Sequence, residues 1–208
     1  MAYPIFTMDS MLKQNGGPVT LSSMFINISE LKPGVVDAIR NTCVLAAVSK
    51  AVDLWGRNQP LTIRDIVPLD MAYATNEFTE ISGGAAAWNI MAFGPFTVPT
   101  ATVIGIYGLK LSAIMDATMQ LLPITAVRID VGGSRHAQWD VETLNVTLDS
   151  AGVATTYPLG GVTKSPIIVA EDITVTISEY CRTAYNGTVY YPVWLGVCVE
   201  KQGVTLMA

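Results

Sequence analysis

Histidine and cysteine are scarce in this chain, and their scarcity narrows its possible chemistry. His136 is the only histidine, so at most one imidazole is available to a catalytic triad or a metal site. Cys43, Cys181 and Cys198 are an odd number and share no Cys-x-x-Cys spacing. We expect buried thiols, with a Cys181–Cys198 disulfide as the alternative, because both residues lie on the arms of one predicted hairpin. The sequence predicts no metal site and no cofactor.

Charge is the second shortage. Charged residues make up 14% of the 208 residues and hydrophobic residues 50%. A soluble domain usually has about a quarter of its residues charged, so this composition indicates surface that is buried against partners. The 12 Lys and Arg against 17 Asp and Glu give a net charge of -5, and no basic run occurs. We expect no direct contact with nucleic acid, because phosphate neutralisation requires clustered cations.

Long uninterrupted apolar runs are missing as well. No charged side chain occurs between Glu80 and Lys110, but Pro95, Pro99 and several glycines interrupt this segment. Proline breaks a helix, and a membrane span needs about 20 consecutive apolar residues, so buried β-strands are the better prediction. The segment from Met1 to Gly16 has no apolar core of signal-peptide length, so we do not expect export by a signal sequence.

The pattern that is present predicts an all-β domain with one helix. Residues 1–19 are expected to form an extended N-terminal arm and residues 20–208 a single domain. The helix is predicted at Val35 to Leu54, opened by Pro33-Gly34 and stopped by Gly56. It is expected to bury at least one face, and the alternative is that it lies between the sheet and a partner or membrane surface. The predicted strands have the spacing of a sandwich or an eight-stranded jelly roll: Thr20–Ile28, Leu61–Leu69, Trp88–Phe93, Thr97–Leu111, Ile124–Val131, Trp139–Leu148, Gly152–Tyr157, Ile167–Tyr180 and Val189–Val199.

The clearest local signal lies near the C-terminus. Ile173, Val175 and Ile177 alternate with polar residues, which is typical of a half-buried strand. Asn186-Gly187 is a strong two-residue turn signal and predicts a hairpin between this strand and the one from Val189.

No motif in the chain predicts an enzyme. Around His136, polar residues follow Gly132-Gly133, but closeness in sequence does not supply the geometry of a nucleophile and its base, and a solvated turn is the favoured interpretation. The polar neighbours are Ser134, Arg135, Gln138 and Asp140. The acidic pairs Glu171-Asp172 and Asp140 with Glu142 could in principle serve glycoside chemistry, but surface acids are the simpler interpretation. We therefore assign no catalytic, cofactor-binding or metal-binding residue.

Aromatic residues offer one binding alternative. Trp88, Trp139 and Trp194 fall in predicted strands, and tyrosines 185, 190 and 191 surround the Asn-Gly turn. Such rings could stack against a sugar or anchor a protein contact, although plain cross-strand pairing is favoured. Asn27, Asn145 and Asn186 begin sequons that matter only in a glycosylating compartment.

Three segments together resemble a known family. They are Val98-Pro99-Thr100-Ala101-Thr102-Val103-Ile104-Gly105-Ile106-Tyr107-Gly108, Ile173-Thr174-Val175-Thr176-Ile177 and Trp194-Leu195-Gly196-Val197-Cys198-Val199-Glu200. In these segments, and over roughly residues 60 to 200, the chain is similar in style to the single jelly-roll major capsid proteins of icosahedral, internal-membrane viruses of archaea and thermophilic bacteria.

The resemblance implies eight-stranded barrels that associate side by side into capsomers and tile a shell over a lipid vesicle. The implied function is structural, as a capsid protein of the virion. The implied partners are copies of the chain, other capsid or penton proteins and the internal membrane surface. The main alternative is a carbohydrate- or ligand-binding β-sandwich that uses tyrosines 185, 190 and 191 or Trp139 as its platform. A hydrolase using His136 or an acidic pair, and a pilus or surface-layer subunit, are further alternatives.

Overall fold

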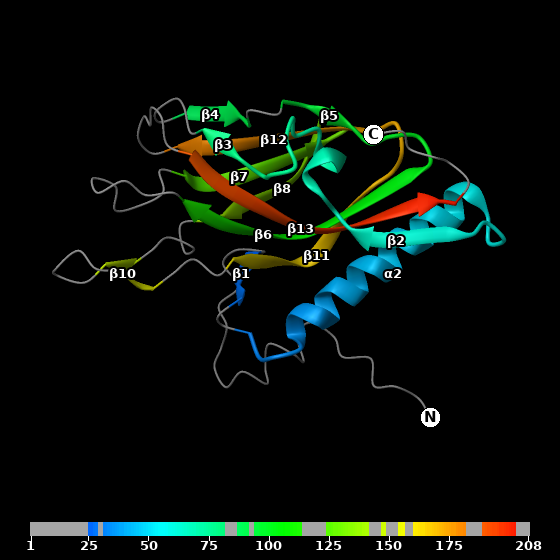
Figure 1. The fold of residues 1–208 in the computed structure, drawn as a ribbon, viewed down its shortest axis with the longest axis horizontal. Helices are drawn as coiled ribbons and strands as arrows, with labels where there is room; N and C mark the ends of the chain where they lie inside the picture. Colours follow the sequence, from blue (N-terminus) through cyan, green and yellow to red (C-terminus); the bar gives the residue numbers. More distant parts are fainter. Residues whose placement is uncertain are drawn as a thin grey trace.

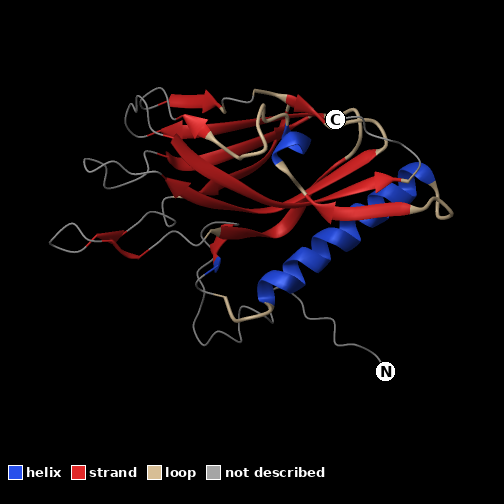
Figure 2. Cartoon of the chain, viewed as in Figure 1, coloured by secondary structure: helices blue, strands red, loops and turns tan. Residues whose placement is uncertain are grey.

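Two antiparallel sheets face each other, and one long helix covers the outer face of the first sheet (Figure 1). The computed structural model describes residues 25–28, 31–81, 87–91, 94–113, 124–141, 147–148, 154–156, 160–181 and 189–202. The chain is mostly β, and the all-β sandwich predicted from the sequence is confirmed at this level (Figure 2). The predicted arm at residues 1–19 lies outside the described residues.

The first sheet has the order β1-β11-β6-β13-β2, with β3 also paired to β13. Its strands are β1 (Phe25–Asn27), β2 (Leu61–Asp65), β3 (Glu80–Ile81), β6 (Thr102–Ala113), β11 (Gly161–Val169) and β13 (Val189–Lys201). The second sheet has the order β4-β12-β7-β8, with β5 also paired to β12. Its strands are β4 (Ala87–Ile90), β5 (Phe96–Thr97), β7 (Ile124–Val131), β8 (Ser134–Asp140) and β12 (Thr174–Cys181). A separate ribbon pairs β9 (Thr147–Leu148) with β10 (Ala154–Thr156).

The helix α2 (Val35–Trp55) begins and ends close to where the sequence predicts. Gly34 has φ 86° and Gly56 has φ 90°, a left-handed region that glycine enters without strain, and the Gly56 N–H donates to the Val52 carbonyl. A 3-10 helix, η2 (Pro68–Met71), follows β2, so the strand predicted at Leu61–Leu69 ends at Asp65. No helix within the described residues combines the length and apolarity that a membrane crossing requires.

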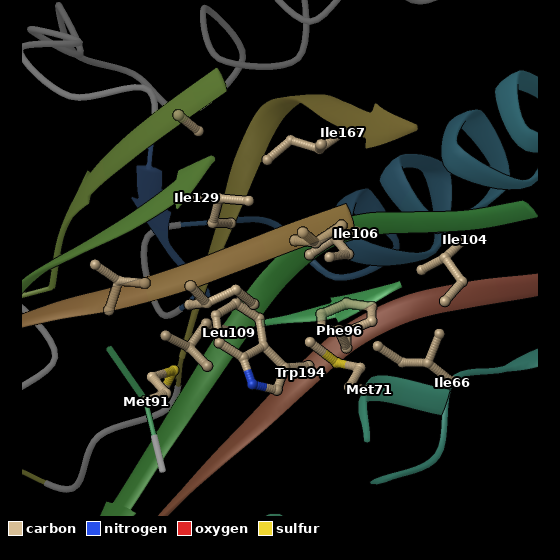
Figure 3. Close-up of a cluster of buried hydrophobic side chains, with 14 of the residues drawn as sticks. Ile66, Met71, Met91, Phe96, Ile104, Ile106, Leu109, Ile129, Ile167 and Trp194 are labelled. Atoms are coloured by element: carbon tan, nitrogen blue, oxygen red, sulfur yellow. The ribbon is translucent and has the colours of Figure 1, made fainter. Parts of the chain in front are cut away.

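The buried side chains form two layers. The larger core fills the space between the sheets, where Trp194 and Leu109 of the first sheet meet Ile129 of the second (Figure 3). The smaller core lies between α2 and the first sheet, where Cys43 and Ala47 pack against Val103 and Val197. The helix therefore buries one face against the sheet, as expected. Leu45, on the opposite side of the helix, is strongly exposed.

Three predicted strands are wrong in extent. The strand predicted at Ile167–Tyr180 is two strands, β11 and β12, which belong to opposite sheets and are joined by a turn in which Asp172 has φ 61°. The strand predicted at Thr97–Leu111 is likewise divided, because Ala101 at φ 63° turns the chain from β5 into β6. The strand predicted at Trp139–Leu148 combines the end of β8 with β9. In each case the predicted strand runs through a turn or loop that separates two strands of the structure.

The predicted C-terminal hairpin is also wrong for the described strands. β12 pairs with β4, β5 and β7, whereas β13 pairs with β6 along one edge and with β2 and β3 along the other. Both edges of β13 are therefore occupied along most of its length, so β12 cannot join it. The Asn186-Gly187 turn itself lies outside the described residues.

Candidate functional site

The cluster around His136 is the edge strand β8 rather than a solvated turn. Ser134, His136 and Gln138 are exposed, while Ala137 and Trp139 point into the core. The register between β7 and β8 skips His136, which makes it the extra residue of a β-bulge. Gly132 and Gly133, both at positive φ, form the tight turn between the two strands. An exposed bulge on an edge does not assemble a nucleophile, a base and an orienting group.

The acidic pair Glu171-Asp172 stabilises the turn between β11 and β12. Glu171 accepts hydrogen bonds from Trp55 Nε1 at 3.0 Å and from the Ala101 backbone N–H at 2.5 Å. Asp172 accepts one from Thr100 Oγ1 at 3.0 Å. These carboxylates connect the end of α2 to the β5–β6 turn, which is a structural role. Asp140 is exposed at the end of β8, and Glu142 lies outside the described residues.

Two of the three candidate tryptophans are inside the protein. Trp139 is 0% exposed and Trp194 is 2% exposed, and their rings pack with centroids 6.2 Å apart. Trp139 therefore cannot serve as a sugar platform, contrary to the alternative considered from the sequence. Tyr191 is half-buried, whereas residue 185 and the side chain of residue 190 lie outside what the structure describes.

Trp88 is the exception, because it lies half-buried on the second sheet. Its ring meets Tyr180 edge-on with centroids 5.5 Å apart, and the Arg128 guanidinium lies 5.0 Å from the Trp88 ring centroid. Arg128 also pairs with Asp130 at 3.1 Å. The register of β4, β12 and β7 places these residues side by side across three strands. Among the described residues, this aromatic and cationic group has side chains of the kind that sugar recognition uses.

The three cysteines are buried thiols, as expected. The alternative Cys181–Cys198 disulfide is wrong, because the structure contains both residues as thiols, Cys181 on the second sheet and Cys198 on the first. Burial raises the pKa of the Cys43 thiol to about 12, and it raises the pKa of the Cys198 thiol as well. Inert thiols of this kind are core residues rather than nucleophiles. Among the sequons, Asn27 lies in β1, and the other two fall outside the described residues.

A buried acidic pair is the feature that the sequence analysis missed. Glu80 of β3 is 2% exposed and Glu179 of β12 is 3% exposed, so each sheet contributes one carboxyl to the interior. Tyr73 hydrogen-bonds Glu80, and Trp194 Nε1 donates to the Tyr73 hydroxyl at 3.2 Å. Cys181 Sγ donates to Glu179 Oε1 at 3.7 Å. The sequence does indicate the position of Glu179, because it follows Val175 and Ile177 at alternate positions of β12, and alternate side chains point to the same side of a strand.

The electrostatics of this pair favour a retained proton. Burial and, to a smaller extent, the negative charge of Glu80 together raise the pKa of Glu179 from 4.5 to about 8. Ionising two neighbouring carboxyls in an interior without water costs a large free energy, because both charges are desolvated and repel each other. A catalytic acid must also be reached by its substrate, and both side chains are almost completely enclosed. We interpret the pair as a structural group that holds a proton between the sheets.

A second charged cluster connects β2, η2 and β13. Arg64 donates to Asp70 through Nη1 at 2.6 Å and Nη2 at 2.7 Å, and to Glu200 at 2.5 Å. Asp70, Cys198 and Glu200 each offer a ligand atom within 4.8 Å of the others, which is close enough for a metal ion. The Arg64 guanidinium already supplies the positive charge among these groups, so an ion-pair network explains the cluster without a metal.

No family model matches the chain, and no curated protein matches it.

Proposed function

We propose that the chain is a structural subunit that assembles with copies of itself, as a single jelly-roll capsid protein of a virion. The observation that carries the proposal is the strand order. Leaving aside the short β1 next to β11 and the β9–β10 ribbon, and counting β2 with β3 and β4 with β5, the first sheet has the order β2/β3-β13-β6-β11 and the second has the order β4/β5-β12-β7-β8. Along the chain, these eight strands visit the sheets in the order first, second, first, second, second, first, second, first. Two Greek keys folded into facing sheets would produce this order, which supports the proposed jelly roll.

The surface supports assembly over catalysis. Large apolar side chains remain exposed at Leu45, Ile63, Val67, Leu69 and Ile90, in a chain with few charges. Exposed apolar groups that gather near one another usually mark contact surfaces. Repeated symmetric contacts between copies would bury them.

The proposed role also implies binding partners and a location in the shell of the virion. Copies of the chain would tile a shell together with other capsid or penton proteins, and one face would meet an internal membrane surface. The proposal includes no enzymatic activity and no direct contact with nucleic acid. The low positive charge supports the last point, since no cationic stripe is available for phosphates.

Negative-stain electron microscopy of the purified protein, across protein concentration and salt, tests this proposal. Rings, hexagonal capsomers or closed shells are expected. Open filaments would instead indicate a pilus-type subunit, because heterologous contacts that do not close produce fibres. A dispersed monomer at high concentration would refute the assembly proposal.

The second candidate function is carbohydrate binding, and Trp88 with Tyr180 and Arg128 favours it. Aromatic rings beside a guanidinium offer stacking and hydrogen bonds to a sugar. A glycan array with wild type and Trp88→Ala tests this function, and Ile90→Ala on the same strand is the matched control. Binding that is lost only in Trp88→Ala would support the function, and a blank array would remove it.

A further inference from the structure

β2 is the outermost strand of the first sheet on its side, and within the described residues no other strand bonds the polar backbone groups along its outer edge. β2 pairs only with β13 within the described part of the chain. The Ile66 N–H donates to Gly196 at 3.2 Å, and the Gln202 N–H donates to Pro60 at 2.9 Å. In an antiparallel ladder alternate residues bond the same neighbour, so the even-numbered residues of β2 bond β13. The N–H and C=O groups of Leu61, Ile63 and Asp65 therefore point away from the sheet.

The other sheet edges carry the devices that normally prevent strand pairing. β8 has a bulge at His136 and exposes Arg135 and Asp140. The edge formed by β4 and β5 is interrupted between Ile90 and Phe96, where Pro95 stands. β1 is three residues long. Bulges, charges, proline and short length are the usual protections of an edge.

β2 lacks two of these protections, the bulge and the proline. Its register with β13 runs from Leu61 to Asp65 without a bulge, and it contains no proline. α2 packs mainly over β6, β11 and β13, and it reaches β2 through the Arg40–Asp65 ion pair and through Leu61, which packs against the smaller core. Figure 1 shows β2 at the border of the sheet, beyond β13.

The charges on β2 are neutralised within the same subunit. Arg64 is paired with Asp70 and Glu200, and Asp65 is paired with Arg40 at 2.7 Å. Arg64 also donates a long bond of 3.3 Å to the outward carbonyl of Asp65, which a stronger partner could replace. β2 itself carries one positive and one negative charge, Arg64 and Asp65, so its own net charge is zero and does not repel an identical strand.

Apolar side chains gather at the same edge. Ile63 is 45% exposed, Val67 is 43% exposed and Leu69 is 52% exposed, all within a short stretch of chain. Ile63 lies at the centre of β2, so a twofold axis through its backbone would place Ile63 opposite its own copy, and Leu61 opposite Asp65. A contact of this kind is self-complementary, as a symmetric dimer requires.

We propose that β2 pairs with β2 of a second copy in antiparallel orientation about Ile63, joining two first sheets into one continuous sheet. This interface rests on the proposed assembly function and identifies one contact within it. The backbone groups of Leu61, Ile63 and Asp65 supply the hydrogen bonds, and Ile63, Val67 and Leu69 supply apolar area.

Sedimentation velocity of the full chain over a concentration series tests the interface. Ile63→Pro removes the outward N–H and leaves the β2–β13 bonds intact, because edge strands tolerate proline where the N–H faces outward. We expect dimer dissociation to shift to at least about tenfold higher concentration, since each lost hydrogen bond contributes a sizeable part of a tenfold change. Ile63→Val keeps both the N–H and the apolar surface and should match wild type.

A cysteine variant keeps the test decisive if Ile63→Pro folds poorly. The native thiols are buried, so Ile63→Cys introduces the reactive thiol, and its copy would lie at about 5.5 Å between Cα atoms, within disulfide range. We expect covalent dimers on mild oxidation, and none from Gln138→Cys on the edge strand β8. If the wild type assembles, an unchanged dissociation concentration in Ile63→Pro together with no covalent dimer in Ile63→Cys would overturn this interface alone. A wild type that stays monomeric would overturn both the interface and the proposed function.

Discussion

Cys43 and Gly105 meet where α2 crosses β6, and the sulfur occupies the space that a side chain at position 105 would need. A Cβ built on Gly105 would lie 2.6 Å from Cys43 Sγ, and 3.2 Å from methyl groups of Ile168 and Val197. Real Cβ atoms do not approach a sulfur that closely, so the helix rests directly on the strand backbone. The glycine in the uncharged segment therefore sets the distance between the helix and the first sheet.

Gly105→Ala is expected to lower the free energy of unfolding by about 1–3 kcal/mol, because the added methyl must displace Cys43 or the helix. Cys43→Ala removes the sulfur, so the double variant should be less destabilised than the sum of the single variants, by about 0.5 kcal/mol or more. Urea unfolding of the four proteins measures this coupling. Additive effects would show that the two residues are not in repulsive contact.

Gly108→Ala is the matched control for the comparison of the Gly105 and Cys43 single and double variants. Its added Cβ would lie 2.5 Å from the Gly161 carbonyl oxygen, which is backbone and cannot move aside. We expect Gly108→Ala to be at least as destabilising, and Cys43→Ala to give no relief.

The three native thiols should react slowly while the protein is folded. Cys43, Cys181 and Cys198 are buried, and the raised pKa values of Cys43 and Cys198 leave little thiolate at neutral pH. Ellman's reagent should therefore label all three at the rate of unfolding, and at once in denaturant. A fast-reacting thiol, or an intact mass lacking two hydrogens, would contradict this expectation.

Local signals in the sequence predicted the elements better than their partners. Pro33-Gly34 and Gly56 delimit α2 because they act on the backbone within a few residues, and the strand at Ile124–Val131 appears with its predicted bounds. The hairpin at Asn186-Gly187 fails because strand pairing is decided elsewhere. β6 takes one edge of β13, and β2 and β3 take the other.

The acidic pair shows the same limit at the candidate site. The inward position of Glu179 could be read from the alternation of β12, because side-chain direction along a strand has a period of two. Glu80 could not be identified in this way, because β3 is only two residues long and lies between the predicted strands Leu61–Leu69 and Trp88–Phe93, where no alternation is visible. Its approach to Glu179 depends on how two sheets face each other, which no local pattern encodes.

Arg64 should contribute more to stability than Arg40, although both form ion pairs. Arg64 joins two largely buried carboxylates, whereas Arg40 has a single partner, Asp65, whose side chain is 66% exposed. We expect Arg64→Met to cost about 1–2 kcal/mol, a value reduced by partial solvent screening, and Arg40→Met about 0.5 kcal/mol or less. Urea midpoints at low and high salt measure both. Equal losses, or a greater salt sensitivity for Arg64, would contradict the network.

Glu179 should make the protein less stable as the pH rises from about 4.5 to about 8. The unfolded carboxyl releases its proton near 4.5, whereas burial and the charge of Glu80 raise its folded pKa to about 8. Between these values the folded state holds a proton that the unfolded state has lost, so stability falls by up to about 1.4 kcal/mol per pH unit. The full stability is present below the unfolded pKa, and the loss is complete above the folded one.

Glu179→Gln keeps the shape of the side chain and cannot ionise, so it should flatten this dependence and unfold at higher urea than wild type at pH 8. Glu77→Gln is the matched control, because Glu77 is exposed and should leave the pH profile unchanged. Urea midpoints from pH 4 to pH 9 for the three proteins give the difference profile, which cancels the titration of all other groups. A Glu179→Gln profile parallel to wild type would mean that Glu179 is already ionised in the folded protein at neutral pH. The proton held between the sheets would then be absent.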